Sequence, residues 1–482
     1  MGRFRPHRMY PGALLAQEAC TYQASCELLA QLRGDLVVLI HSDRDCSNVL
    51  PKTRRRIWAE HEYKFLCTNL TEDEMVTGMG NRKLRRAIEL IHEAYKPELI
   101  VVLSTCPTVM IGDNVKNVAR KAGRELGIRV VSQITHGLKP KSPAEVVDKL
   151  YKTLAKAAEA PSGDVGKRVN LVGIGMNRAE RREIEAVLGA MGLAINVVID
   201  ERAQVDDFLA VGNAGWNVHP GPHMLLDFSE WAEKRLGARS IEVPLPYGVD
   251  ATDRFYRQIA DAIGIDDATA TEAIGERRNL ACAARDTFRD RMTERFGDRR
   301  PALGYNIGSV RSFDLRRIAL EELGELPMMH ELGFDVRLFI QGPQHEANWD
   351  RTAGVLEELG VDLPFLLFPD PGLLVHFLAD PAERPDLFYG ARFLGDQLLQ
   401  VNVPLVHHRD TRMGYDGVAA NCALMDGALT SRFFEHFDEE VVTAGGTELL
   451  DEMRSQGKGG GPGNGRGATI ATKQLGVGRR DG

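Results

Sequence analysis

The sequence lacks any uninterrupted apolar run of about eighteen residues, the length that a membrane-spanning helix requires. Residues 1–20 carry basic side chains but no long apolar stretch before a small-residue cleavage site, so we expect no secretory signal. Positive charge is not in excess either, because the net charge is −8. These absences predict a cytoplasmic protein with neither a membrane nor nucleic acid as its main partner.

Two kinds of short sequence motif, a cysteine pair and a phosphate-binding loop, are also absent from the sequence. The chain has no C-x-x-C pair, which excludes a zinc ribbon and a self-contained ferredoxin motif. It has no G-x-x-x-x-G-K-[ST] loop, so we expect no ATP site in this chain. Its seven cysteines are an odd number in a chain without an export signal. Structural disulfides are therefore not expected, and thiolate ligands become the alternative.

What is present is an alternation of strand-like and helix-like segments in a chain of 482 residues, too long for one ordinary domain. Amphipathic stretches such as 81–95 and 178–193 separate short apolar runs rich in β-branched residues. The runs that we expect to be buried parallel strands are 35–41, 98–104, 128–134, 168–174 and 194–200. This order predicts an α/β protein whose Rossmann-like domains have mostly parallel sheets.

The pattern restarts near Pro301, with a strand, a helix over 315–332, and further strands at DVRLFIQ and PFLLFPD. We therefore predict three α/β domains, followed by a helical segment that packs back on the first domain and a Gly-rich basic tail, flexible or bound to a partner. The predicted boundaries are 1–160 for the first domain, which carries the cluster cysteines, 161–297, 298–405, 406–456 for the helical segment (with a helix near 421–437) and 457–482 for the tail.

Cysteines follow two neighbouring predicted strands. Cys46 lies after the strand 35–41 and Cys106 after the strand 98–104, so both belong to the carboxyl edge of one sheet, where α/β proteins place their sites. Cys20 lies upstream and can reach the same edge, and Cys67 lies at another strand end. Three thiolates leave a cubane one ligand short, which suggests a site completed by another chain. The alternative for each is a small buried core residue, which we expect for Cys26, Cys282 and Cys422.

Three motifs in the first predicted domain carry a family resemblance. HSDRDCSN is similar to a His-Gly-x-x-Gly-Cys loop without its glycines, and CTNLTEDEMVTGMG to a Met-Thr-Glu-Asp segment followed by a glycine turn. STCPTVMIGDNV matches Thr-Cys-x-x-x-x-Ile-Gly-Asp-Asp except at Asn114. In order and spacing the chain resembles nitrogenase component 1 and its relatives, which include dark-operative protochlorophyllide and chlorophyllide reductases and cofactor-assembly scaffolds.

The resemblance implies a cluster site and partners. Cys20, Cys46 and Cys106 fall where the family places the ligands of an interfacial iron–sulfur cluster, and Cys67 where a ligand is not usual. The cluster would be P-cluster-like [8Fe-7S], or [4Fe-4S], shared with a homologous α-type subunit that holds a second metallocluster. A separate ATP-dependent iron-protein reductase would supply electrons, and the complex would be an α2β2 heterotetramer.

Later segments resemble the β-type subunit. PYGVDATDRFYRQIA and LVHHRDTRMGYDGV are similar to β-type motifs, and GWNVHPGPHM has Pro220 where an α-type subunit carries its cofactor-ligating cysteine. Four histidines are candidates for groups near a cofactor, with solvated or core histidines as the alternative: His219, His223, His407 and His408.

Among these relatives the chain is most similar to methylthio-alkane reductases, which implies reductive cleavage of a carbon–sulfur bond with release of methanethiol. Three alternatives share the fold: a nitrogenase subunit, a cofactor-assembly scaffold and a chlorophyllide-type reductase. A fourth belongs to another class, a metal-free α/β protein that binds a small ligand between its domains and uses its cysteines as core residues.

Overall fold

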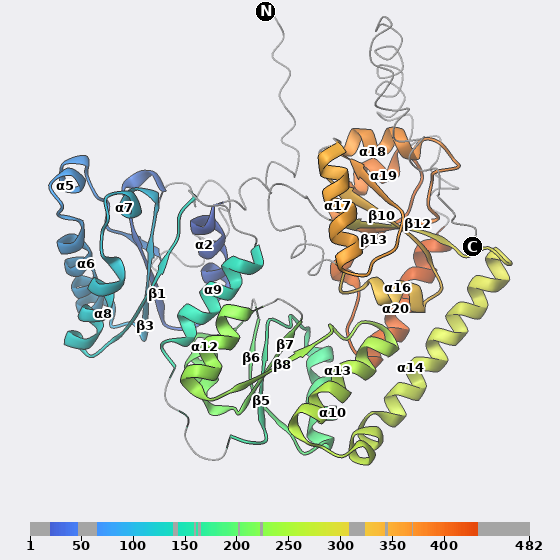
Figure 1. Ribbon diagram of the computed structural model, residues 1–482, viewed down its shortest axis with the longest axis horizontal. Coiled ribbons are helices and arrows are strands. Elements are labelled where there is room, and N and C mark those ends of the chain that lie inside the picture. The colour runs from blue at the N-terminus through green and yellow to red at the C-terminus, as the bar shows by residue number, and fades with distance from the viewer. Residues whose placement is uncertain are drawn as a thin grey trace, which may run out of the picture. The chain divides into compact units, whose positions relative to one another are not determined.

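The computed structural model describes residues 20–46, 65–137, 143–158, 161, 165–200, 203–221, 225–307, 323–342, 346–368 and 370–431. They form two compact units (Figure 1). The first contains the described residues up to 284 together with 323–328 and 412–419, and the second contains 285–307, 329–411 and 420–431. The predicted tail 457–482 lies outside the described residues, as do 308–322 and 432–456.

The first unit begins with a four-stranded sheet of order β2-β1-β3-β4, in which all strands are parallel. Its strands are β1 (Leu36–His41), β2 (Phe65–Cys67), β3 (Leu99–Ser104) and β4 (Arg129–Ile134). Every residue of β1 and β3 is buried, which explains why both read as continuous apolar runs and not as an alternation of apolar and polar residues.

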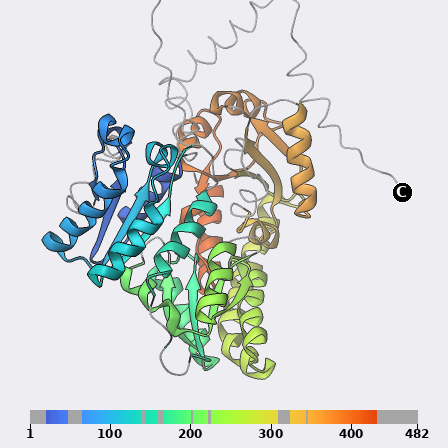
Figure 2. The ribbon, with the colours of Figure 1, turned by 60° about the vertical axis from the view of Figure 1, so that its left-hand side comes forward.

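Helices cover both faces of this sheet, as Figures 1 and 2 show. Val38 and Ile40 of β1 pack in one cluster with residues of α2 (Thr21–Gln31) and α9 (Pro143–Ala155). Val37 and Leu39 pack in another with residues of α6 (Gly80–Tyr95) and α8 (Val115–Leu126). This alternation is the two-residue period of a strand. Two short helices, α5 (Glu72–Val76) and α7 (Cys106–Met110), complete this part.

The second sheet of the first unit has the order β6-β5-β7-β8 and is also parallel. The elements of this part are β5 (Arg168–Val172), α10 (Arg178–Ala190), β6 (Ala194–Ile199), α11 (Val205–Leu209), η2 (Ala210–Asn213), β7 (Trp216–Pro220), α12 (Leu226–Leu236), β8 (Arg239–Val243) and α13 (Gly248–Ile263). The next helix, α14 (Asp267–Phe296), begins in the first unit and continues in the second from residue 285. Three asparagines link the strands of this sheet: the Asn170 amide donates to Asn217 Oδ1, and the Asn196 amide donates to Asn170 Oδ1, each at 2.8 Å. Because buried polar groups must be paired, this ladder fixes the relative position of the three strands.

The second unit contains a five-stranded parallel sheet of order β11-β10-β9-β12-β13. Its strands are β9 (Ala302–Ile307), β10 (Asp335–Gln341), β11 (Phe365–Phe368), β12 (Leu387–Gly390) and β13 (Leu405–His407). The remaining helices of the described chain are α16 (Leu326–Glu331), α17 (Glu346–Glu358), α18 (Pro371–Leu378), η3 (Arg392–Leu394), α19 (Gly395–Leu399), η4 (His408–Asp410) and α20 (Tyr415–Leu429).

The predicted α/β class with parallel sheets is confirmed, since all ten strand pairings of the three sheets are parallel. The predicted helix at 178–193 is α10, and the helix expected near 421–437 begins earlier, at Tyr415. The domain boundaries at 160, 297 and 405 remain predictions. Among the described helices, none is both long and apolar enough to cross a bilayer.

Buried carboxylates attach residues 412–419 to α10 within the first unit. Glu183 is 1% exposed and accepts the backbone N–H groups of Tyr415 at 2.8 Å and Asp416 at 2.9 Å. Glu180 accepts the N–H of Met413 at 2.9 Å. Gly414, between these donors, has φ of +83°, and a Cβ added there would overlap the Glu183 carboxylate. The turn therefore needs a glycine for both its backbone conformation and its close approach to Glu183.

We expect Gly414→Ala to lower the stability of the chain by at least about 1 kcal/mol, because alanine is strained at this φ and displaces Glu183 from its donors. The urea midpoint of unfolding measures the effect. Gly189→Ala is the matched control, since Gly189 lies in α10 and its added Cβ meets no atom within 4 Å. The control should hold or raise the midpoint, and an equal midpoint for both variants would contradict the role of the turn.

Candidate functional site

The predicted ligands Cys46 and Cys106 follow two strands that are hydrogen-bonded neighbours. His41 at the end of β1 is in register with Ser104 at the end of β3. Cys46 comes five residues after His41, and Cys106 is the first residue of α7. Cys20 is the N-cap residue of α2, which lies on one face of the same sheet. All three are half-buried free thiols.

Cys46 lies within electrostatic reach of both Cys20 and Cys106. Burial raises the pKa of the Cys46 thiol, a hydrogen bond with Ser42 opposes this, and the charges of Asp43, Cys106 and Cys20 raise the pKa further. Like charges disfavour one another's ionised forms. Without a positive centre between them, the geometry therefore favours the neutral Cys46 thiol, and a bound cation or cluster would favour the thiolate.

The N-terminus of α2 is tied to both cysteine-bearing turns. The Tyr22 hydroxyl donates to the carbonyl of Cys46 at 3.1 Å. Thr21 exchanges two hydrogen bonds of 2.8 Å with the backbone of His136, in the turn after β4. The next residue, Gly137, donates its N–H to Cys106 Sγ at 3.1 Å. Hydrogen bonds to ligand sulfurs are among the factors that set the potentials of iron–sulfur sites.

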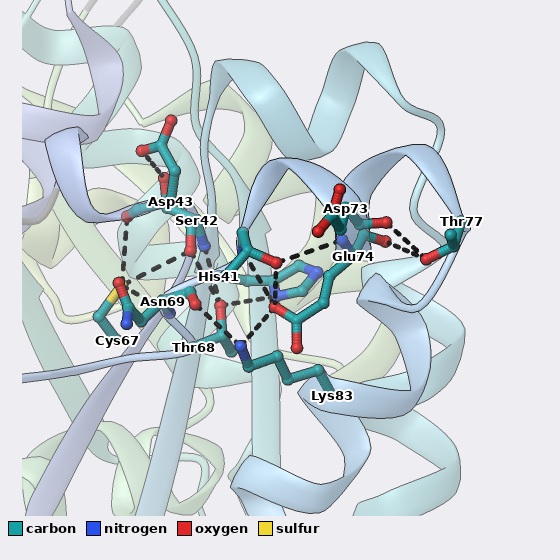
Figure 3. Close-up of polar contacts among 11 residues, drawn as sticks. His41, Ser42, Asp43, Cys67, Thr68, Asn69, Asp73, Glu74, Thr77 and Lys83 are labelled. Carbon is teal, nitrogen blue, oxygen red and sulfur yellow. Dashed lines mark hydrogen bonds and ion pairs between the residues drawn. The ribbon is translucent and has the colours of Figure 1, made fainter.

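Cys67 has different surroundings, which Figure 3 shows. Its thiol donates toward the carbonyls of Asp43 at 3.4 Å and Ser42 at 3.6 Å, and its sulfur accepts the N–H of Asn69 at 3.2 Å. A thiol that donates to backbone carbonyls is protonated. These hydrogen bonds join Cys67 to the turn after β1, and its place outside the ligand set remains a prediction.

Within the described chain, no three histidine, cysteine, aspartate or glutamate side chains converge on a point where one metal ion could sit. The ligands of a multi-iron cluster bind different iron atoms, so their sulfurs need not converge in that way. The donor set itself, three half-buried thiols, fits iron–sulfur chemistry because thiolates are soft, charged ligands.

The structure describes three of the four candidate histidines, and their surroundings differ. His219 is 1% exposed, and its ring contacts the Pro220 carbonyl through Nδ1 at 3.1 Å and the Ser229 hydroxyl through Nε2 at 3.0 Å. Both nitrogens are thus occupied, as in a core histidine. His223 lies outside the described residues. His407 and His408 contact each other ring to ring, and burial together with His408 lowers the pKa of His407 to about 4.

With this geometry established, comparison with known proteins decides the family. A model for nitrogenase component 1 type oxidoreductases matches residues 21–310, more than half of the chain. The chain belongs to the nitrogenase component 1 type oxidoreductase family.

Relatives of this family member have several roles. The nitrogenase molybdenum–iron protein alpha chain of Methanosarcina barkeri is 31% identical over 26% of this chain and 24% of its own length. The nitrogenase iron–molybdenum cofactor biosynthesis protein NifE of Nostoc sp. is 27% identical, with 54% of each chain covered. One of the subunits of light-independent protochlorophyllide reductase from Nostoc sp. is 23% identical, with 44% of each chain covered. The chain thus spans about half the length of these relatives or less.

A solved structure supports the fold over a longer span. Nitrogenase Cp1 at pH 6.5 superposes with a TM-score of 0.63, covering 89% of this chain and 94% of that chain at 15% sequence identity. At this identity the likeness concerns the fold alone. It confirms the nitrogenase component 1-like architecture that the sequence motifs implied.

A network of hydroxyl and carboxylate hydrogen bonds joins the two cysteine turns, and it was not predicted from the sequence. The Thr105 hydroxyl donates to Ser42 Oγ at 2.7 Å, and Ser42 donates to Asp43 Oδ1 at 3.1 Å. Asp43 Oδ1 in turn accepts the N–H of Cys46 at 3.3 Å. The residue before Cys106 is therefore connected to the N–H of Cys46. A usable signal was the group of polar residues directly after two apolar strands.

Thr108 tests how much this network contributes to stability. Its hydroxyl is fully buried, accepts the N–H of Thr105 and contacts the carbonyl of His41, each at 3.1 Å. Thr108→Val keeps the shape but leaves the Thr105 N–H without its acceptor and removes one of two hydroxyl contacts to the His41 carbonyl, the other being from Thr105 Oγ1 at 3.4 Å. We therefore expect a loss of about 1–3 kcal/mol in a urea titration. Thr77→Val removes an exposed hydroxyl and should change stability by less than about 0.5 kcal/mol. If Thr108→Val and Thr77→Val lost similar amounts of stability, the buried hydroxyl would contribute no more to stability than an exposed one.

Proposed function

We propose that this chain is the β-type subunit of a nitrogenase-like reductase and that Cys20, Cys46 and Cys106 are its ligands to an interfacial iron–sulfur cluster. The observation that carries the proposal is that Cys46 and Cys106 follow neighbouring strands of the first sheet and that the half-buried Cys46 interacts electrostatically with both Cys106 and Cys20. Thiols in mutual electrostatic contact disfavour one another's ionisation, and iron relieves that repulsion because it binds thiolates.

The chain supplies part of the site, and a homologous α-type subunit supplies the rest. Three thiolates do not complete the ligand set of a [4Fe-4S] cluster or of a P-cluster-like [8Fe-7S] cluster. The bound cluster would accept and pass on single electrons from an ATP-dependent iron-protein reductase. Cys20, Cys46 and Cys106 would supply three of its thiolate ligands, and the Gly137 N–H donates to Cys106 Sγ. We propose an α2β2 complex.

The β-type assignment is supported by the end of β7. Pro220 is the last residue of this strand, the sequence resemblance aligns it with the α-type cofactor ligand, and proline has no ligand atom. The adjacent His219 has both ring nitrogens in hydrogen bonds with other groups. Neither residue offers a free donor, so we assign the second metallocluster to the α-type partner.

For the substrate we propose a methylthio-alkane. Two electrons and two protons would break its carbon–sulfur bond, giving the alkane and methanethiol. The support is the similarity of the sequence to methylthio-alkane reductases. The test is methanethiol release by the complex with its reductase and ATP. If the complex instead formed ammonia from dinitrogen, or reduced a chlorophyllide-type substrate, the methylthio-alkane proposal would be wrong.

A cofactor-assembly scaffold is the second candidate, and the similarity to NifE favours it. A scaffold would pass a metallocluster to an acceptor protein and turn over substrates poorly. The two candidates share the cysteine edge, so cluster transfer from the anaerobically purified complex, measured beside methanethiol release, separates them.

Iron analysis of cysteine variants tests the ligand assignment. In a complex purified anaerobically with co-expressed partners, we expect iron well above the roughly four atoms of one cubane per pair of subunits. Cys106→Ala and Cys46→Ala should each lose the iron and acid-labile sulfide of the interfacial cluster, because a thiolate ligand is missing. Cys282→Ala in α14 and Cys67→Ala should retain both.

Two outcomes would contradict the proposal. Unchanged iron in Cys106→Ala would remove Cys106 from the ligand set. A stable, colourless, iron-free wild-type complex would favour the metal-free binding protein, in which the cysteines are core residues.

A further inference from the structure

His41 and Asp113 form a buried pair beneath the two cysteine turns. His41 Nε2 lies 2.9 Å from Asp113 Oδ2, and the two side chains are 0% and 4% exposed. The other ring nitrogen, Nδ1, lies 3.1 Å from Thr68 Oγ1. A buried carboxylate and a buried imidazole 72 residues apart in sequence are expensive to bury unless each is well paired, as both are here.

The pair lies where the two turns meet. Cys106 begins α7, and Asp113 lies in the turn that follows this helix. His41 ends β1 and is followed by the turn that carries Cys46, and its carbonyl contacts the Thr108 hydroxyl of α7. A contact between His41 and Asp113 therefore fixes one turn relative to the other.

Thr68 has one hydroxyl proton and two acceptors for it. Its Oγ1 accepts the N–H of Ser42 at 3.1 Å and lies 3.2 Å from the Ser42 carbonyl and 3.1 Å from His41 Nδ1. When His41 is neutral, with its proton on Nε2 facing Asp113, Nδ1 is an acceptor and receives the Thr68 proton. When His41 is doubly protonated, Nδ1 donates, and the Thr68 hydroxyl turns to the Ser42 carbonyl. One proton on His41 thus changes the hydrogen bonding of the first residue of the Cys46 turn (Figure 3).

Asp113 is the charged group that contacts the His41 ring. Burial lowers the pKa of His41, and Asp113, which would raise it, compensates only in part. The neighbouring elements contribute Thr68 after β2, Ser104 from β3 and Gly80 from α6, where an added Cβ would overlap the Asp113 carboxylate. Three further charged groups near the turn have partners of their own: Asp43 binds the Ser42 hydroxyl, and Glu74 and Lys83 bind each other at 2.5 Å.

We infer that His41 is a positioning residue for the cluster: paired with Asp113 it aligns the cysteine turns, and through Thr68 it couples its own protonation to the Cys46 turn. The inference rests on the proposed function. His41 Nδ1 would take up one proton from solvent when a bound cluster is reduced by one electron. The charge of the buried region is then unchanged, and no bond other than N–H is made.

The consequence is a cluster potential that depends on pH. Above the lowered pKa of His41 in the oxidised complex, the midpoint potential should fall by up to about 59 mV for each tenfold decrease in proton concentration. Redox titration monitored by electron paramagnetic resonance, at several pH values, measures this in the purified complex. His41→Gln retains a donor to Asp113 but takes up no proton, so its potential should be independent of pH.

A matched pair at Thr68 separates coupling from simple stability. Thr68→Ser keeps the hydroxyl and should reproduce the wild-type profile. Thr68→Val removes the acceptor of Nδ1–H, so the pH-dependent range should move to lower pH at unchanged iron content. If His41→Gln does not assemble, this pair still decides the question.

The outcomes distinguish this inference from the proposed function. A wild-type complex without iron overturns the proposed function and the inference with it. Iron-loaded complexes in which wild type and Thr68→Val have the same pH profile, or in which His41→Gln keeps the wild-type slope, overturn the role of His41 alone. A flat His41→Gln profile with a displaced Thr68→Val profile supports it.

Discussion

The register of β1 against β3 is the constraint on which the candidate site depends. The six pairs from Leu36↔Leu99 to His41↔Ser104 have no interruption, and both strands are buried along their whole length. A slip of one residue would move every side chain to the opposite face, into a different apolar cluster. The free energy that fixes this register is the burial of apolar surface on two faces, and the positions of the Cys46 and Cys106 turns follow from it.

Apolar packing fixes where the strands end, but hydrogen bonds determine how the turns continue. The carbonyls and hydroxyls at the ends of β1 and β3 contact each other directly through Thr105, Thr108 and Ser42. Such a network has one satisfied arrangement, because each unpaired member would carry the penalty of a buried polar group. It can therefore hold the turns in place before any metal binds, so that assembly of a cluster would need less ordering of the chain.

The sequence was sufficient for strands such as β1 and β3, because parallel strands buried on both faces give continuous apolar runs, as in 98–104. The strands β8, β12 and β13 were not predicted. The sequence was also sufficient for the placement of Cys46 and Cys106, which follows from the strand ends alone. It was not sufficient for contacts between distant segments. The Tyr22 hydroxyl on the Cys46 carbonyl, the Gly137 N–H on Cys106 and the pairing of His41 with Asp113 join residues up to 72 positions apart, and no local pattern encodes them. Asp113 stood in a recognised motif, but only the structure gives it a partner.

Membership in the nitrogenase component 1 type family fixes the architecture and leaves the chemistry open, because relatives of one fold include reductase subunits and a cofactor biosynthesis protein. The cysteine edge does not separate these roles, since an electron relay and a scaffold can both use it. The end of β7 bears on which subunit would hold a second metallocluster. There Pro220 has no ligand atom and the ring of His219 is already hydrogen-bonded, while the nearby His223 lies outside the described residues. If Cys20, Cys46 and Cys106 bind a cluster as proposed, this chain would hold an electron-transfer site at the edge of its first sheet, and the catalytic centre would lie in a partner subunit.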